Sequence, residues 1–190
     1  MFFEDFKLGM VWQLDRPIKI TRELMRDYGS KYDVAPIHND EEVGKRSKFG
    51  QIIAPGTMTS MLLWSEWISR YNTLDNFMAG SSSYIDWYTP LMEGDELTGT
   101  CEVIEVESMN PHNGKVVVQF KGYNQKGEYC IEVKDTLYIG KTEEGIMQGL
   151  RDRVTASTAA VEKAEAELAK KKALLEKSIR QLAEAEAAQK

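Results

Sequence analysis

The sequence has few cysteines, few histidines and no long apolar run, and each shortage narrows what the protein can be. Its 190 residues hold two cysteines and two histidines. Cys101 and Cys130 stand alone, without C-x-x-C spacing or a histidine cluster, which argues against a zinc site or a disulfide scaffold. We therefore expect no metal and two reduced thiols. No stretch reaches the roughly 18 to 20 apolar residues of a membrane-spanning helix, so no membrane partner is expected.

Positive charge is also in short supply. The 30 Asp and Glu residues outnumber the 24 Lys and Arg residues, which gives a formal net charge of -6. Nucleic-acid-binding proteins normally present a basic face, so nucleic acid is not expected as a partner. The start of the chain, MFFEDFKLGM, has acidic residues where a secretory signal peptide would need positive charge before an apolar stretch. These features predict a globular, cytoplasmic protein.

The last 36 residues lack glycine, proline and aromatic side chains altogether. They consist mostly of Ala, Glu, Lys and Leu, which have high helix propensity. We therefore divide the chain into a domain at 1–150 and a helical tail at 151–190.

The tail carries one regular apolar position. Apolar residues recur every seven positions, at Val161, Leu168, Leu175 and Leu182. Three residues beyond each of them lies a weaker position, occupied by Ala164, Lys171, Ser178 and Ala185. The pattern favours a helix that packs on its own domain or on a protein partner, with a coiled coil as the alternative.

The first 150 residues change from a helical to a strand period, which predicts an α+β domain. A helix capped by Thr21 is expected at 21–33, followed by a polar helix at 40–50. The stretch 56–71, GTMTSMLLWSEWISRY, is apolar on nearly all sides, which is typical of a central helix. Alternation with a period of two then predicts strands at 96–108, 115–123 and 128–139. Short turns separate these strands, so we expect an antiparallel sheet wrapped around the central helix.

One of the two histidines lies in the motif YDVAPIHND. Pro36 opposes a regular helix and biases Ala35 toward an extended backbone, which predicts an irregular loop carrying Asp33 and His38. A carboxylate and an imidazole on such a loop can hold one water molecule. Ordinary turn and capping residues would give the same motif, so it does not decide the function alone. His112, in the turn NPHNG, is expected to be exposed.

Three segments, DVAPIHND, FGQIIAPGTM and WYTPLMEGDEL, follow one another along the chain. In this order they resemble three elements of the MaoC-like dehydratase family, the (R)-specific enoyl-CoA hydratases of hot-dog fold. The first element is Asp-x-Asn-Pro-x-His. The second is a Phe-Gly pair, followed by a hydrophobic pair and then by the glycine that opens the central helix. The third is an aromatic residue, followed by a proline and then by a Gly-Asp pair. The similarity runs from about residue 3 to residue 139. The sequence departs from the family at Ala35, where Asn or Gln is usual, and the tail lies outside it.

The resemblance implies a hot-dog domain with hydro-lyase activity. The reaction would be the reversible hydration of a 2-enoyl-CoA or carrier thioester to the (R)-3-hydroxyacyl thioester. Coenzyme A would be part of the substrate, and no other cofactor is implied. Asp33 and His38 would form the catalytic dyad, and the backbone N–H at Gly56 would stabilise the thioester oxyanion. The family also implies a homo-oligomer, a dimer or larger.

Substrate-binding candidates follow from the same implied chemistry. Lys45, Arg46 and Lys48 form the basic cluster nearest to the dyad in sequence and suit the phosphates of coenzyme A. A solvated helix end would explain these three residues equally well. Trp64 would shorten an acyl tunnel if it faced one. Met58, Met61, Trp67 and Trp87 are further bulky candidates for the acyl pocket. For all five residues, a position in the hydrophobic core is more common than one in a pocket wall.

Two other functions fit the same signature. A hot-dog thioesterase would use a carboxylate on the central helix, where Glu66 is the acidic candidate. A non-catalytic acyl-CoA-binding subunit of a hetero-oligomer would tolerate the substitution at Ala35 and use the tail to recruit a partner.

Overall fold

The computed structural model describes residues 1–71 and 73–187, with the side chains at 178, 180 and 182–187 outside the description. The chain divides into two compact units, Met1–Gly145 and Ile146–Lys190. The boundary expected at residue 150 falls inside the second unit. All the buried apolar residues that the structure describes lie between Phe6 and Ile139, so the first unit contains the core.

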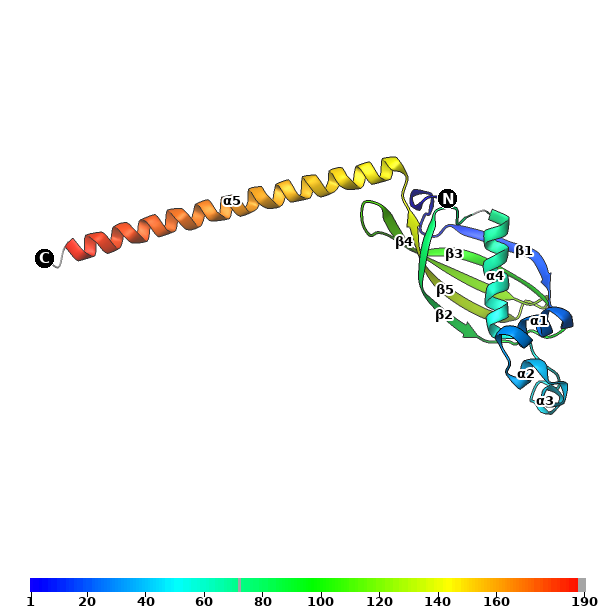
Figure 1. Cartoon of the computed structure of the whole chain (residues 1–190). Helices are drawn as coiled ribbons and strands as arrows, with labels where there is room; N and C mark the ends of the chain where they lie inside the picture. Colours follow the sequence, from blue (N-terminus) through cyan, green and yellow to red (C-terminus); the bar gives the residue numbers. More distant parts are fainter. Residues whose placement is uncertain (72, 188–190) are drawn as a thin grey trace. The chain divides into compact units, whose positions relative to one another are not determined.

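Five antiparallel strands form one sheet in the order β1-β3-β4-β5-β2 (Figure 1). They are β1 Val11–Lys19, β2 Phe77–Trp87, β3 Glu96–Ser108, β4 Asn113–Tyr123 and β5 Tyr129–Gly140. The last three confirm the strands that the alternation predicts. β1 and β2 were not predicted, because β1 contains Pro17 with a register shift between Leu14 and Ile18, and β2 is rich in Gly and Ser.

Helix α4, Gly56–Tyr71, packs against one face of the sheet (Figure 1) and has the predicted bounds. The alternate residues of β3, β4 and β5 point toward it and are buried. Trp67 is fully buried, with its ring 5.4 Å from Trp12 and 5.6 Å from Phe120. Burial of each such side chain contributes roughly 1.5 to 3 kcal/mol. The helix is not covered on all sides, since Met61 on its outer side is 50% exposed. This arrangement is the hot-dog fold, an antiparallel sheet with one central helix.

Three short helices lie near the beginning of α4 (Figure 1): α1 Arg22–Tyr32, α2 Pro36–Asn39 and α3 Glu41–Arg46. The hydroxyl of Thr21 accepts a hydrogen bond from the Leu24 N–H at 3.2 Å and begins α1, as predicted. A 3-10 turn, η1 Phe3–Asp5, precedes the first strand.

Helix α5, Glu143–Ala187, confirms the long C-terminal helix. Every side chain from 150 to 177 is exposed. None of the helices in the described part of the chain combines the length and the apolar character needed to cross a membrane. The role of this tail stays a prediction.

Candidate active site

The segment between α1 and α4 brings Asp33 and His38 together. Asp33 follows the last residue of α1, and its Oδ1 accepts a hydrogen bond from the Ala35 N–H at 3.4 Å. Pro36 occupies the first position of α2, where a helix needs no N–H. His38 therefore lies on a helical turn, and the expected irregular loop is confined to the residues before Pro36. The prediction of an irregular loop through His38 was wrong, because the first position of a helix accepts proline.

Asn39 closes this loop with its side-chain amide. Its Nδ2 donates to the carbonyl oxygen of Asp33 at 2.8 Å and to that of Ala35 at 3.1 Å. Gly29 allows the approach, because a Cβ there would lie 2.5 Å from Asn39 Oδ1. The amide missing at Ala35 thus has a counterpart at Asn39, which supports the backbone at Asp33 and Ala35.

The two side chains face each other through specific atoms. His38 Nε2 lies 3.6 Å from Asp33 Oδ2, and the side chains are 12% and 28% exposed, respectively. His38 Nδ1 lies 2.8 Å from the carbonyl oxygen of Ile53, which can only accept a hydrogen bond. Neutral His38 therefore carries its proton on Nδ1 and presents the Nε2 lone pair to Asp33. Two acceptors at this separation can both receive hydrogen bonds from one water molecule.

Ile53 also fixes the segment in front of α4. Its N–H donates to the Ile37 carbonyl at 3.3 Å, and the Ala54 N–H donates to the Leu91 carbonyl at 2.8 Å. The chain then reaches Gly56, the first residue of α4. The first N–H groups of a helix have no partner within it and carry the positive end of its dipole, so they can receive a developing negative charge.

A cavity of about 390 Å³ joins these parts. Asp33, His38 and Gly56 all line it, so the structure brings the three predicted catalytic residues to one place. The other walls come from the segment before α4, the start of α4, the end of β2 with the segment after it, and β5: Phe49, Ile53, Ala54, Thr57, Thr59, Trp87, Tyr88, Thr89, Pro90, Leu91 and Cys130. Most of this lining is apolar, as suits an acyl chain.

Trp87 lies directly against the beginning of α4. A Cβ at Gly56 would be 2.4 Å from Trp87 Nε1, so this position accepts only glycine while the indole stays in place. Beyond it, Tyr88 stacks on Tyr129 with ring centroids 4.6 Å apart. Trp87 and Tyr88 line the cavity, yet each is 55% exposed, so this wall lies at the protein surface.

Cys130 is the thiol that lines the cavity. Burial raises its pKa to about 11, and its Sγ donates to the Glu128 carbonyl at 3.3 Å. The thiol is protonated at neutral pH and is therefore not a ready nucleophile.

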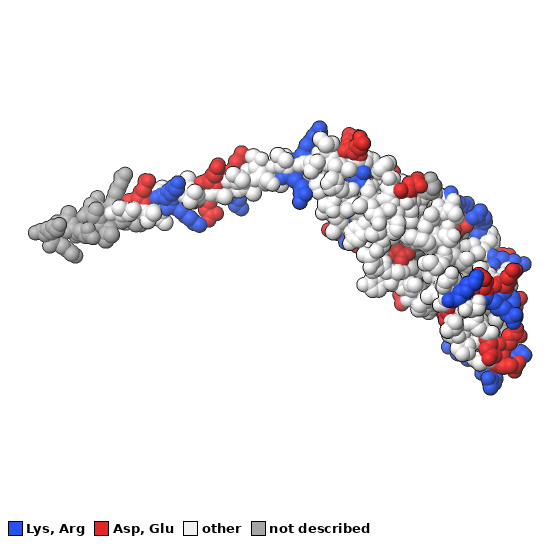
Figure 2. Space-filling model, viewed as in Figure 1, with Lys and Arg blue, Asp and Glu red and all other residues white. Residues whose placement is uncertain are grey.

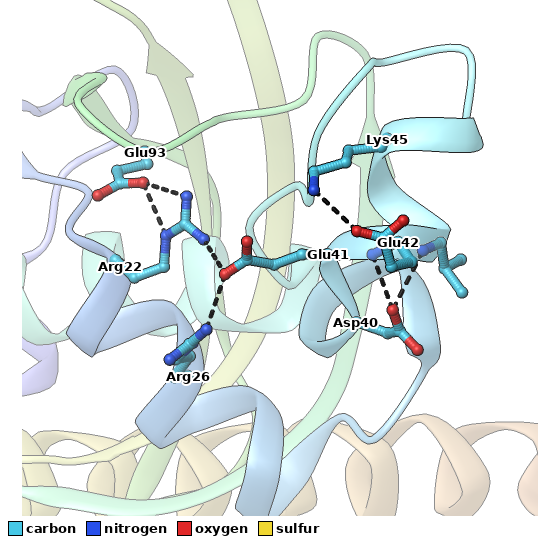
Figure 3. Close-up of polar contacts among 8 residues, drawn as sticks. Arg22, Arg26, Asp40, Glu41, Glu42, Lys45 and Glu93 are labelled. Atoms are coloured by element: carbon cyan, nitrogen blue, oxygen red, sulfur yellow. Dashed lines mark hydrogen bonds and ion pairs between the residues drawn. The ribbon is translucent and has the colours of Figure 1, made fainter.

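An ion-pair network ties α1 to α3 and to the loop before β3 (Figure 3). Arg22 lies between Glu41, with Nη1 to Oε1 at 2.6 Å, and Glu93, with Nε to Oε2 at 2.7 Å. Arg26 joins the same oxygen of Glu41 at 2.8 Å. Asp40 caps α3 by accepting from the N–H of Glu42 at 2.8 Å. The dyad segment is therefore held at both ends by polar contacts.

The four substrate-binding candidates lie in different surroundings. Lys45 pairs with Glu42 at 2.8 Å, and Arg46 donates to the Glu42 carbonyl at 3.1 Å. Lys48 lies 5.0 Å above the ring of Phe49, which lines the cavity. Trp64 instead packs in the aromatic core, 5.7 Å from Trp67, and the structure does not bring it to the cavity.

Glu66, the candidate carboxylate of a thioesterase, is directed elsewhere. It is buried on α4, forms an ion pair with Arg16 and has a second cation, Arg70, at 3.8 Å. The cavity is lined by other residues of α4, Gly56, Thr57 and Thr59. The arrangement therefore does not favour the thioesterase alternative.

Sequence reasoning did not single out Phe49, Tyr88, Leu91 or Cys130. The first three belong to the FGQIIAPGTM and WYTPLMEGDEL segments, so those motifs carried a usable signal. Cys130 comes from β5 and has no local signal, because only the strand pairing brings it to the site. Trp87, one of several bulky candidates, does line the cavity.

Comparisons with known proteins agree with this fold. The family model described as MaoC like domain matches residues 5–124. Among solved structures, a monoamine oxidase regulatory protein from Archaeoglobus is 22% identical, with 75% of this chain and 95% of that chain covered and a TM-score of 0.70. The unliganded (R)-hydratase PhaJ1 from Pseudomonas aeruginosa is 16% identical over 74% of this chain and 86% of that chain, with a TM-score of 0.59.

A third similar structure is the C-terminally truncated HadBC complex, a 3R-hydroxyacyl-ACP dehydratase from Mycobacterium tuberculosis. It is 20% identical over 69% of this chain and 96% of that chain, with a TM-score of 0.61. No curated protein sequence matches this chain. The family model covers more than half of the sequence, and the chain belongs to the MaoC-like domain family.

Proposed function

We propose that the protein is a hydro-lyase that reversibly adds water to a 2-enoyl thioester and forms the (R)-3-hydroxyacyl thioester. The observation that carries this proposal is the pair of facing acceptors, Asp33 Oδ2 and His38 Nε2, beside the beginning of α4. Members of the same fold named as (R)-hydratase and 3R-hydroxyacyl-ACP dehydratase support the reaction class.

The dyad activates the water. One water molecule donates its two protons to Asp33 and His38 and directs a lone pair at the β-carbon of the alkene. As the new C–O bond forms, a proton passes to the dyad, and the electron pair of the alkene moves toward the thioester. The dyad returns a proton to the α-carbon on the same face. The atoms balance with water alone, and no electrons are transferred to or from another group.

The beginning of α4 stabilises the intermediate charge. The thioester oxygen becomes negative while the enolate exists, and the N–H at Gly56 is a donor fixed in advance at a helix N-terminus. Gly56 has no side chain and Trp87 packs where a Cβ would lie, so the indole forms a wall beside this N–H.

The substrate would carry coenzyme A or a carrier phosphopantetheine. Of the three basic candidates, Lys48 has the strongest support, because its neighbour Phe49 lines the cavity and the other two are engaged by Glu42. A cation at this position suits a phosphate at the cavity entrance. Lys45 and Arg46 would contribute after release from Glu42.

A second copy of the chain would pair with the first through the edge strand β2. This edge strand has eleven residues, of which Asp86 is the one charged residue. Nearly all its side chains are exposed, and Figure 2 shows few charges over this part of the surface, whereas charges gather over α1 to α3. An open edge of this length with a single charge normally pairs with another strand. We therefore include a homodimer through β2, which would also cover Trp87 and Tyr88.

The product identifies the reaction. The full chain is incubated with crotonyl-CoA, and the product is analysed for free thiol and for the configuration of 3-hydroxybutyryl-CoA. Formation of the (R) product without free thiol is expected. Release of free coenzyme A, or formation of the (S) product, would overturn the proposal. A panel of longer and aromatic enoyl-CoAs covers a different acyl preference, and no hydration of any member would indicate a non-catalytic subunit.

A further inference from the structure

Helix α5 exposes a row of large apolar side chains. Eight of them are between 40% and 67% exposed: Met147, Leu150, Val154, Val161, Leu168, Leu174, Leu175 and Ile179. Most helices in proteins are stabilised by packing of an apolar face, and large apolar side chains exposed along a helix mark an interaction surface. The row therefore indicates a binding partner.

The spacing of the apolar side chains indicates what kind of partner fits the helix. Val154, Val161, Leu168 and Leu175 recur every seven residues and form one edge of the seam. The other edge, three residues further on, has small or long polar residues, such as Ser157, Ala164 and Lys171. A partner helix fits this seam best where its large residues face the small ones. In an antiparallel pair of identical helices the two edges face each other, so each large residue meets a small one or a flexible stem.

The charges indicate the direction of the partner. An acidic group, Glu162, Glu165 and Glu167, lies directly before Leu168, and the basic group Lys170–Lys172 lies directly after it. Figure 2 shows acidic and basic side chains in successive groups along this helix. A parallel pair in register would place Lys171 against Lys171 of the other copy within the seam. An antiparallel pair centred near Leu168 places each acidic group beside the basic group of the other helix, which is the favourable arrangement.

We propose that α5 pairs in antiparallel orientation with α5 of a second copy, with the two-fold axis between Leu168 and Lys171. In this register Leu168 contacts the stem of Lys171 of the other copy, and Leu175 faces Ala164. Glu165 faces Lys172 across the edge of the pair. The symmetry repeats each contact on the other side of the axis. This pairing does not depend on the proposed hydration and uses other residues.

Cysteine cross-linking in the full chain tests both the contact and its direction. The double variant Ala164→Cys/Leu175→Cys places each new thiol opposite its counterpart in the other copy. Under oxidation we expect this variant to form covalent dimers, whereas Ala164→Cys and Leu175→Cys alone stay monomeric on a denaturing gel. An intrachain disulfide is excluded, because eleven residues of helix separate the two thiols by roughly 16 Å. Wild-type protein is the negative control and should form no covalent dimer, since Cys101 and Cys130 are buried.

The matched control is Ala166→Cys/Ala173→Cys. These two residues lie at the same level along the pair but on the outer side of the helix. The control variant is therefore expected to stay monomeric. Dimers from both single variants would indicate a parallel pair and overturn the proposal. Equal cross-linking of the inner and outer double variants, or none in either, would also overturn it.

A charge exchange tests the edge contact. Glu165→Lys places like charges opposite each other, and in the 164/175 double-cysteine chain it is expected to lower the cross-linked fraction by about threefold. Adding Lys172→Glu restores the opposite charges and the yield. Glu162→Lys, which makes the same change in charge away from the seam, is expected to leave the yield unchanged. An equal loss with Glu165→Lys and Glu162→Lys would show a general charge effect and contradict the register.

Discussion

Single backbone contacts determine what the site residues can do. The Ile53 carbonyl selects the tautomer of His38, and the amide of Asn39 holds the loop that carries Asp33. Gly56 leaves room for Trp87 where any side chain would collide with the indole. None of these partners is adjacent in sequence to the residue that it positions. The motif therefore names the reacting groups, whereas their orientation depends on neighbours brought in by the fold.

The contact between Gly56 and Trp87 leads to a first prediction. Gly56→Ala forces the indole away from the beginning of α4, because the new Cβ would lie 2.4 Å from Nε1. We expect kcat/KM for an enoyl-CoA to fall by about 10²-fold as the oxyanion donor is blocked or displaced. Steady-state kinetics measure this effect. Gly80→Ala is the control, because its Cβ would make only ordinary contacts at 3.9 Å. Equal activity of Gly56→Ala and wild type would contradict the role of this helix terminus.

A buried carboxyl in the sheet gives a prediction on pH. Burial raises the pKa of Asp135, and a hydrogen bond with Ser83 only partly offsets the effect. The folded state therefore prefers the protonated acid, so this residue stabilises the fold below about pH 3.8 and costs stability as the pH rises through its raised pKa.

Asp135→Asn removes the buried charge and keeps the shape. We expect the variant to be more stable than wild type by about 1 kcal/mol at pH 7, and the difference to disappear below about pH 3.8. Thermal unfolding across this pH range measures it. A variant less stable than wild type at pH 7 would show that the carboxylate is needed in its charged form.

At the scale of elements, the strongly patterned segments were predictable and the weakly patterned ones were not. α4 and β3 to β5 have clear periods, and their bounds agree with the prediction to within two residues. β2 has a run of Gly and Ser with little strand propensity and forms a strand because β5 pairs with it along its length. The dyad and Gly56 were found from motifs. The cavity walls from β5 and the placement of Trp64 in the core needed the tertiary structure.

The open edge of β2 carries a prediction on assembly. Ser82→Lys/Tyr84→Lys adds two positive charges to an exposed strand, and a two-fold axis would bring them near the same charges of the second copy. In a chain ended at residue 152, which lacks the tail seam, we expect light scattering to show half the mass of the unmodified truncated chain. Gln119→Lys, on β4 inside the sheet, is expected to leave the mass unchanged. An unchanged mass for the β2 variant would exclude pairing through this edge.

At the scale of the whole molecule, we assign catalysis to the first unit and the pairing of α5 to the second. The buried apolar core that the structure describes lies entirely before residue 140, and so do the residues that line the cavity. A chain ended at residue 152 should therefore fold and hydrate an enoyl-CoA with kcat/KM within about twofold of the full chain. Circular dichroism checks the fold and steady-state kinetics check the activity. A folded truncated chain without activity would show that the tail contributes to the site.

The most direct test of the central claim is to follow the enoyl-thioester absorbance of crotonyl-CoA with wild type, Asp33→Asn and His38→Ala. His112→Ala serves as the control, since it removes the other histidine from a turn between β3 and β4. We expect wild type and His112→Ala to deplete the band, without free thiol, at similar rates. The two dyad variants should unfold at the wild-type temperature and be at least about 10²-fold slower. Folded dyad variants that hydrate at the wild-type rate would contradict the assignment of Asp33 and His38.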